Sequence, residues 1–234
     1  MNILAIDTTG QISSCALITQ EYGQAHIAAE FTINTKLTHS QTIIPLIDSM
    51  LTAANFNKTE LDLIAASSGP GSFTGLRIGA STAKGLACGL GIKIVPVSTL
   101  DALAYNIQID GAAIVPMMDA RRNQVYAATY HNSCGSLRRV SEYMAEDVRV
   151  VLELAAAQGR PVVFLGDGVA VNKAAIEAYP QFSIAQAGFN LQRAALVGLL
   201  AAKNTKDAVP PADFQLLYIR KSQAERERDE RLCK

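Results

Sequence analysis

The chain has 234 residues, of which 49% are hydrophobic and 18% charged, so it can bury a core large enough for one large domain or two small ones. Its formal net charge of zero argues against a strongly basic nucleic-acid surface on this chain alone, so we expect any role on RNA to involve a partner. No stretch reaches the ~20 apolar residues of a membrane span, and the start lacks the basic segment of a secretory signal, so we expect a cytoplasmic protein with no membrane contact.

Apolar runs separated by polar turns predict alternating strands and helices along the first half of the chain. The predicted elements are strands at 3–6, 12–17 and 25–33, a helix at 40–54, a strand at 61–66, a helix at 75–90 and a strand at 92–97. Asp7 and Thr8 begin the polar turn after the first strand. Because an Asp side chain readily bonds to the backbone two residues further on, we expect an Asx turn at Asp7.

A glycine-rich loop separates the strand at 61–66 from the helix at 75–90. Its sequence is Ser67-Ser68-Gly69-Pro70-Gly71-Ser72-Phe73-Thr74-Gly75-Leu76-Arg77-Ile78-Gly79. Gly69 and Gly71 permit positive φ, and Ser72 can cap the helix start, whose unpaired N–H groups favour an anion. These three residues are therefore candidate phosphate-binding residues. The alternative is that the glycines serve only a turn and close helix packing.

The better-defined nucleotide and nucleophile motifs do not fit this loop. A P-loop requires Lys directly after its last glycine, where this chain has Leu76. The dinucleotide fingerprint requires its third glycine three positions after the second, but the next glycine after Gly71 is Gly75. A nucleophile elbow requires Ser at the position of Phe73. The loop therefore offers a backbone suited to an anion without the side chains of these catalytic motifs.

The second half of the chain repeats the pattern of the first. A strand at 115–118 ends at Asp119, which lies 112 residues after Asp7, and a returning strand is expected at 125–130. A helix at about 145–158 and a strand at 161–165 follow, and that strand ends at Gly166 and Gly168. The repeat predicts a duplicated α/β fold of two lobes, each with a mixed β-sheet flanked by helices.

We divide the chain accordingly into an N-terminal lobe at 1–103, a C-terminal lobe at 104–205 and a charged tail at 206–234. The tail alternates acidic and basic residues from Lys221 to Arg231 and has no apolar stripe. Such a segment is typical of a solvated helix end or of disorder.

The helices at 40–54 and 75–90 carry more apolar surface than packing on one sheet requires. In the second helix, small residues four apart would also let the backbone of another chain approach closely. The two helices therefore predict a docking surface for a partner, and ordinary core packing is the alternative. The predicted contact residues are Ile43, Ile47, Met50, Leu51, Gly75, Leu76, Gly79, Ala83 and Leu86.

The histidines and cysteines do not form a recognisable metal-ligand pattern. His26, His39 and His131 lie 13 and 92 residues apart, and the cysteines have no CxxC spacing. We therefore expect no metal site and no cofactor. His39 has no obvious nucleophile beside it, so we expect it to serve the start of a helix rather than to act as a base.

Several of these motifs together resemble the TsaB (YeaZ) family. They are Ile6-Asp7-Thr8, Thr38-His39-Ser40-Gln41, the run from Ser68 to Gly79, and Tyr218-Ile219-Arg220. The resemblance covers essentially the whole chain. It implies the duplicated fold of the actin-like ATPase and sugar kinase superfamily and a role in making N6-threonylcarbamoyladenosine (t6A) beside the anticodon of tRNA.

The resemblance also implies the partners. It implies a non-catalytic subunit that binds and supports the transferase TsaD as a heterodimer, with TsaE as a further partner and TsaC as the supplier of threonylcarbamoyl adenylate. The docking helices would form a bundle with the equivalent pair of TsaD, and alone the chain would form a homodimer through the same face. Contact with tRNA would be made through the complex.

The resemblance gives a test of the non-catalytic role. TsaD carries two metal-binding histidines one helical turn apart, and the matching positions here are Thr99 and Leu103, of which leucine cannot ligate a metal. The alternative function is an ATP-dependent phosphotransferase acting on a small molecule at the cleft between Asp7 and the glycine loop. The candidate residues of this nucleotide or anion site, which the first function would make vestigial, are Asp7, Thr8, Gly69, Gly71, Ser72, Gly166 and Gly168.

Overall fold

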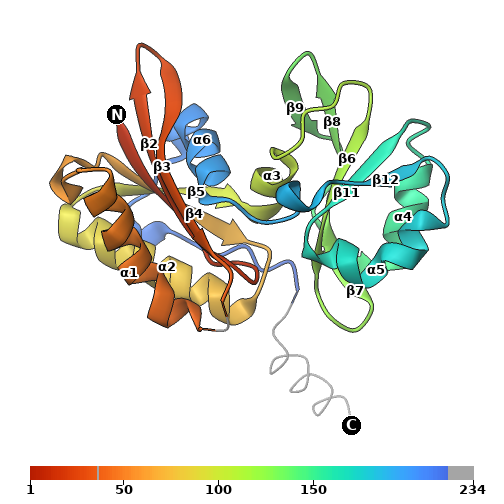
Figure 1. Ribbon diagram of the computed structural model, residues 1–234, viewed down its shortest axis with the longest axis horizontal. Coiled ribbons are helices and arrows are strands. Elements are labelled where there is room, and N and C mark those ends of the chain that lie inside the picture. The colour runs from red at the N-terminus through yellow and green to blue at the C-terminus, as the bar shows by residue number, and fades with distance from the viewer. Residues whose placement is uncertain (36, 221–234) are drawn as a thin grey trace, which may run out of the picture.

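The computed structural model describes residues 1–35 and 37–220 of the chain. Within them, two β-sheets stand side by side, and helices pack on each of them (Figure 1). The charged run from Lys221 to Arg231 that we expected to be solvated lies outside the described residues. In the part of the chain that is described, none of the helices is long and apolar enough to cross a membrane.

The first sheet has the strand order β3-β2-β1-β4-β5. Its strands are β1 (Asn2–Asp7), β2 (Ser13–Glu21), β3 (Gln24–Ile33), β4 (Leu63–Gly69) and β5 (Lys93–Ser98). β2 is antiparallel to both β1 and β3, whereas β4 is parallel to both β1 and β5. The helices α1 (His39–Ala53) and α2 (Phe73–Leu90) cover one face of this sheet (Figure 1). Their apolar sides form one buried core with Leu4, Ile6 and Ile64.

The second sheet has the order β10-β7-β6-β11-β12, with the same directions of pairing as the first. Its strands are β6 (Ala113–Asp119), β7 (Gln124–Ala127), β10 (Met144–Asp147), β11 (Val162–Leu165) and β12 (Phe182–Ile184), and its helices are α4 (Val148–Ala156) and α5 (Asp167–Glu177). Asp7 and Asp119 end the matching strands β1 and β6. The predicted duplication of an α/β unit is therefore confirmed.

Two elements of the second half differ from the sequence prediction. The strand expected at 125–130 is divided, because its end belongs to a separate hairpin of β8 (Tyr130–Ser133) and β9 (Ser136–Arg139), which pairs with β6. The helix expected from residue 145 begins at Val148, because the preceding residues pair with β7 as β10. The Asp147 carboxylate accepts a hydrogen bond from the Arg149 N–H at 2.9 Å and so caps this helix.

The two remaining α-helices pack at the junction of the two halves. α3 (Thr99–Ala104) follows β5 and contacts both sheets: its Ala102 lies in a core with Val95 of the first sheet, and its Leu100 lies in a core with Leu165 of the second. α6 (Ala194–Lys203) follows β12, but it lies in a core with Ile3 of the first sheet. The two helices therefore lie between the sheets (Figure 1) and join the two halves.

The expected lobe boundary at residue 205 is wrong for α6, which packs with the first sheet. The fit is close at Gly198, where a Cβ would lie 2.4 Å from Ile18 Cγ1 and 3.0 Å from Ala5 Cβ. Only glycine lets the helix backbone lie this near to β1 and β2. We therefore use first lobe for the first sheet with α1, α2 and α6, and second lobe for the second sheet with α3, α4 and α5.

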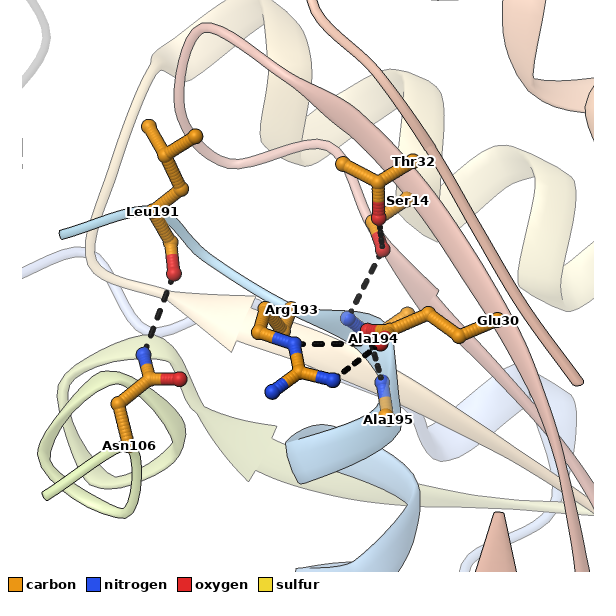
Figure 2. Close-up of polar contacts among 8 residues, drawn as sticks. All are labelled: Ser14, Glu30, Thr32, Asn106, Leu191, Arg193, Ala194 and Ala195. Atoms are coloured by element: carbon orange, nitrogen blue, oxygen red, sulfur yellow. Dashed lines mark hydrogen bonds and ion pairs between the residues drawn. The ribbon is translucent and has the colours of Figure 1, made fainter. Parts of the chain in front are cut away.

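Side chains of the first sheet cap the start of α6 (Figure 2). The Ser14 hydroxyl accepts a hydrogen bond from the Ala194 N–H at 3.0 Å, and the Glu30 carboxylate accepts one from the Ala195 N–H at 3.2 Å. Glu30 also forms an ion pair with Arg193. Because the first N–H groups of a helix lack partners within it, these contacts fix α6 to the first lobe.

After α6 the chain returns along the first lobe as a strap, which we define as residues 208–220. Val209 and Ile94 exchange backbone hydrogen bonds of 2.8 and 2.9 Å at the edge of β5. The Phe214 side chain is 2% exposed and belongs to the core under α1 and α2. The charged tail expected from residue 206 is therefore wrong for this segment, because the strap is packed into the first lobe.

Candidate functional site

The Asp7 carboxylate lies buried at the end of β1 and is held by neighbouring groups. Its Oδ1 accepts hydrogen bonds from the Thr9 N–H at 2.8 Å and the Thr9 hydroxyl at 2.7 Å. Its Oδ2 accepts one from the Ser67 hydroxyl at 2.6 Å. The expected Asx turn is confirmed. Burial raises the pKa of Asp7 above its ordinary value, although the hydrogen bonds from Ser67 and Thr9 act in the opposite direction.

The glycine loop packs directly on the turn between β1 and β2. A Cβ on Gly75 would lie 2.0 Å from the Thr8 carbonyl oxygen, and one on Gly71 would lie 2.6 Å from the Thr9 carbonyl oxygen. The Thr8 hydroxyl lies where a Cβ of Gly79 would be, at 2.5 Å, and donates to the Gly75 carbonyl at 2.7 Å. Protein atoms therefore fill the space between the loop and the turn, which supports the packing function of these glycines.

Ser72 caps α2 as the sequence predicted. Its side chain accepts a hydrogen bond from the Gly75 N–H at 3.3 Å, and its own N–H donates to the Thr9 carbonyl at 2.8 Å. The side chain is exposed at the start of the helix. The cap thus satisfies one of the first N–H groups of α2 with a group of the chain itself.

The strap covers the other side of the glycine loop. Gly69 has φ of +120°, and a Cβ there would lie 2.6 Å from the Leu217 carbonyl oxygen. The Leu217 N–H donates to the Ser68 carbonyl at 2.7 Å, so the strap is bonded to the residue before this glycine. Gly69 is therefore required both by its backbone conformation and by the strap that passes over it.

His39 supports the same turn from α1. Its Nε2 donates to the Gly10 carbonyl at 3.0 Å, so in the neutral ring Nδ1 accepts from the Ser13 hydroxyl at 2.8 Å. Thr38 and Gln41 form the capping box of the helix. The interpretation of His39 as a residue of the helix start is confirmed, and its ring holds the turn in place.

The turn is also closed from the side of the second lobe. Gln192, which precedes α6 and is 2% exposed, lies over Gly10, where a Cβ would be 2.5 Å from its Oε1. No local sequence pattern indicates this contact, because the two residues lie far apart in the chain. Gln192 thus occupies the approach to the turn between the lobes.

The glycine site of the second lobe has the same kind of packing. Gly166, with φ of +110°, and Gly168 lie against β6, where a Cβ would be 2.2 and 3.0 Å respectively from the Met117 carbonyl oxygen. The Gly166 N–H donates to the Asn190 side chain at 3.2 Å. These glycines lie in the second lobe, whereas Asp7, Thr8 and the first glycine loop lie in the first. Each site is filled by its own surroundings.

Asp167, which the sequence analysis did not single out, joins the second glycine site to Asp119. Its carboxylate accepts a hydrogen bond from the Asp119 N–H at 3.1 Å, and the Asp119 carboxylate accepts one from the Arg121 N–H at 2.7 Å. The Asp119 side chain thus forms an Asx turn like that of Asp7. Burial raises the pKa of Asp167. Asp167 could have been found from the sequence, because it directly follows Gly166 at the end of a predicted strand.

The apolar stripes of α1 and α2 face their own sheet. The predicted contact residues buried within the chain are Ile43, Ile47, Met50, Leu51, Gly75, Leu76, Gly79 and Ala83, while Leu86 is half-buried. The choice of these residues as partner contacts is therefore corrected. The side chains of Ile43, Ile47, Met50, Leu51 and Ala83 belong to the core of the first lobe, Leu86 packs against that core, and Gly75 and Gly79 lie against Thr8 of the β1–β2 turn. A partner would meet the outer sides of the two helices instead.

The outer sides of α1 and α2 form a groove of about 530 Å³. Ile44 is 48% exposed and Phe73 39% exposed there, and the Arg77 guanidinium lies 3.8 Å from the centre of the Phe73 ring. The groove is lined by Ser40, Ile43, Ile44, Phe73, Thr74, Arg77, Ile78, Ser81 and Thr82. Exposed aromatic, aliphatic and Arg side chains together are typical of a protein interface.

Within residues 1–35 and 37–220, no group of His, Cys, Asp and Glu side chains comes together as metal ligands. Thr99 and Leu103, the positions that we expected to match the TsaD histidine pair, are buried on α3. Leu103 lies in the core between α3 and the second sheet. These positions therefore serve helix packing.

The duplicated lobes, with one strand order and a polar turn held against a glycine loop in each, define a protein of the actin-like ATPase and sugar kinase fold. Among solved structures, the chain is similar to YeaZ from Pseudomonas aeruginosa, with a TM-score of 0.74 and 26% sequence identity. That match covers 93% of this chain and 99% of the other.

Sequence relatives define the family more closely. The chain is 37% identical over 177 residues to the tRNA threonylcarbamoyladenosine biosynthesis protein TsaB of Bacillus subtilis (strain 168), which is 76% of each protein. It is 37% identical over 132 residues to TsaB of Escherichia coli (strain K12), covering 56% of this chain and 55% of that protein. Residues 26–225 match the family model described as TsaD, tRNA N6-adenosine threonylcarbamoyltransferase. The chain belongs to the TsaB (YeaZ) family, which is related to TsaD.

Proposed function

We propose that this chain takes part in t6A biosynthesis in tRNA as a non-catalytic subunit that binds and supports the TsaD transferase. The observation that carries the proposal is the closure of the glycine loop by the chain's own atoms. Gly71 and Gly75 fit against the β1–β2 turn, and Gly69 fits under the strap. A loop whose glycines are needed for packing supports a structural function rather than phosphate transfer.

The polar side chains near the loop support the same proposal. The buried Asp7 carboxylate is bonded to Ser67 and Thr9, and the His39 ring is bonded to Gly10 and Ser13. A general base must reach the proton that it removes, and neither group is placed to do so. We therefore propose no catalytic residue, metal or cofactor for this chain.

The exposed groove between α1 and α2 is the proposed docking surface for TsaD. Its outward side chains include Ile44, Phe73 and Arg77, while the rest of each apolar stripe is buried in the first lobe. We propose a heterodimer with TsaD through this groove, a homodimer through the same face in the isolated chain, and TsaE as a further partner. TsaC would be linked through the adenylate that it supplies, and tRNA through the complex.

Phosphate transfer to a small molecule, the alternative function, would need an accessible acid beside a free anion site. Asp7 is 1% exposed, and the glycine loop lies against the turn that carries it. Substantial hydrolysis of ATP by the isolated chain, abolished by Asp7→Ala, would support this alternative and contradict the non-catalytic proposal.

The association with TsaD can be tested by light scattering after gel filtration and by calorimetric titration at micromolar concentrations. We expect the wild-type chain to form a heterodimer with TsaD. Ile44→Glu is expected to weaken the affinity at least about tenfold, because it would bury a carboxylate without a partner. Failure of the wild-type chain to associate, with or without nucleotide, would contradict the proposal.

Val171→Glu is the matched control. Val171 is also an aliphatic residue on the outside of a helix, and it is 72% exposed on α5 of the second lobe. We expect this variant to bind TsaD as the wild type does. An equal loss of affinity in both variants would place the docking surface elsewhere than in the groove.

A further inference from the structure

The motif Tyr218-Ile219-Arg220 lies at the end of the strap beside the start of α2. The Tyr218 ring contacts the Phe73 ring in a tilted arrangement with centres 5.4 Å apart, and its hydroxyl accepts a hydrogen bond from Arg77 Nε at 3.4 Å. Arg77 in turn lies over the face of the Phe73 ring. Tyr218, Phe73 and Arg77 thus form one cluster, which we call the aromatic clip.

Backbone contacts on both sides of Tyr218 hold the clip in place. Leu217 is bonded to Ser68 of the glycine loop and lies against Gly69. On the other side, Arg220 Nη1 donates to the Ala120 carbonyl at 2.9 Å, in the turn after β6 of the second lobe. The position of Tyr218 is therefore fixed by both lobes.

The clip is exposed at the end of the groove between α1 and α2. Tyr218 is 45% exposed and Phe73 39% exposed, and both Phe73 and Arg77 line the groove. Two partly exposed aromatic rings with an Arg match the residue types that dominate the energy of protein interfaces. Held in place in this way, they would lose little conformational freedom on binding.

We propose that the strap completes the docking surface: Tyr218 contacts the partner together with Phe73 and Arg77, and Arg220 positions Tyr218 from the second lobe. This inference rests on the proposed function, since the occupant is the TsaD partner. It adds the strap to the helix pair as a third element, and it makes the docking surface depend on both lobes.

The chemistry of the clip also defines what the partner presents to it. Within residues 1–35 and 37–220, no carboxylate forms an ion pair with Arg77. The partner segment is therefore an apolar helix ridge for the groove with an acidic side chain near Arg77, which would bond to the guanidinium in a partly desolvated contact.

Calorimetric titration of TsaD with variants of the full chain tests this inference. Tyr218→Ala removes both the ring and the hydroxyl, and we expect it to weaken the affinity about tenfold or more. Tyr218→Phe keeps the ring and is expected to weaken it only about two- to threefold. Tyr22→Ala is the matched control, because Tyr22 is fully exposed at the β2–β3 turn, and we expect wild-type affinity.

Two further variants separate contact from positioning. Arg77→Gln is expected to weaken binding and to reduce its dependence on salt, which a purely structural role of Arg77 would not do. Arg220→Ala is expected to weaken binding less than Tyr218→Ala does, and to have no further effect in a chain that already carries Tyr218→Ala. Additive effects of these two changes would contradict the positioning role.

The outcomes distinguish this inference from the function on which it rests. If the wild-type chain does not bind TsaD, both are overturned. If the wild-type chain binds and Tyr218→Ala binds as tightly as Tyr22→Ala, only the role of the strap is overturned. Circular dichroism and melting temperature identify a variant that has lost its fold. If Tyr218→Ala is such a variant, the affinity of Tyr218→Phe tests the role of Tyr218, and wild-type affinity in Tyr218→Phe would then contradict that role.

Discussion

The two lobes have the same strand order but differ in the lengths of their strands and helices. In the first lobe, β2 and β3 have 9 and 10 residues and α1 and α2 have 15 and 18, whereas their counterparts β7 and β10 have 4 each and α4 and α5 have 9 and 11. Both lobes fit glycines against backbone carbonyls, those of the β1–β2 turn in the first lobe and that of Met117 in β6 in the second. Within residues 1–35 and 37–220, the strap covers the glycine loop of the first lobe. Duplication thus preserved the packing around the glycines, and the longer helices and the strap give the first lobe its exposed groove.

The largest effect is expected from the strap. Phe214→Ala should lower the free energy of unfolding by about 3–5 kcal/mol, because it leaves a cavity in the core under α1 and α2. Phe189→Ala, at a residue that is 44% exposed in the second half, should cost about 1 kcal/mol or less. Urea denaturation measures both. Equal effects would show that the strap is not part of the first-lobe core.

The glycine contacts of the two lobes should differ in strength. Gly75→Ala places a Cβ 2.0 Å from a backbone oxygen of the β1–β2 turn and should cost about 2–3 kcal/mol. Gly168→Ala in the second lobe, with its nearest backbone oxygen at 3.0 Å, should cost less. Gly85→Ala, on α2 with open space around it, should stabilise the protein by about 0.5–1 kcal/mol.

Thermal and urea denaturation of these three variants measures the order of their free energies of unfolding directly. The opposite signs at Gly75 and Gly85 are the sharpest part of the prediction, because both lie on the same helix. A small effect of Gly75→Ala would mean that the loop has room beside the turn, and the phosphate-binding hypothesis would regain support.

The attachment of α6 to the first lobe should be weaker than these core contacts but measurable. Glu30→Gln removes the charge that pairs with Arg193 and accepts the Ala195 N–H, and it should cost about 1–2 kcal/mol. Glu21→Gln, at the exposed end of β2, should change the stability by no more than about 0.5 kcal/mol. Equal values from urea denaturation would contradict a structural role of the cap shown in Figure 2.

Asp7 should give the smallest effect, seen as a dependence on pH. Its folded-state pKa is raised above the value of 3.8, so the folded protein binds this proton more tightly than the unfolded chain does. The stability that this proton contributes is present below pH 3.8 and is lost as the pH rises through the folded pKa.

In Asp7→Asn, Oδ1 can still accept from Thr9 while the amide NH₂ donates to the Ser67 hydroxyl, so the variant should keep both contacts and lack this dependence on pH. Wild-type stability should therefore fall relative to that of Asp7→Asn as the pH rises through this window, and the difference should then stay constant. Urea denaturation at a series of pH values measures it. A difference that shrinks or reverses with rising pH would contradict the burial of this carboxyl group.

The parts of the molecule that follow local rules could be predicted from the sequence. The Asx turn at Asp7 and the Ser72 cap each depend on a few neighbouring residues. The duplication was visible as a repeated order of such short patterns, and the structure confirms all three. An apolar stripe, however, marks the side of a helix that is buried, so contact residues chosen from it, such as Ile47 and Met50, lie in the core. The exposed Ile44 belongs to the extra apolar width of the same helix. Partner surfaces carry no comparable periodic signal.

Contacts across long sequence separations could not be predicted. Arg77 and Tyr218 meet although they lie 141 residues apart, and Ser14 caps α6 from 180 residues away. The packing of α6 on the first sheet likewise joins residues that lie far apart in the chain. Such contacts are decided by the packing of the whole chain, and a single sequence does not encode them in any short pattern.

Formation of t6A by purified TsaD, with the adenylate supplied and tRNA as acceptor, tests the central claim most directly. The measurement is mass spectrometry of nucleosides from tRNA incubated without this chain, with the wild type, and with the Ile44→Glu and Val171→Glu variants. The proposed function predicts that modification requires the chain, is lost or strongly reduced with Ile44→Glu, and is retained with Val171→Glu. Equal modification without the chain, or with Ile44→Glu in place of the wild type, would contradict it.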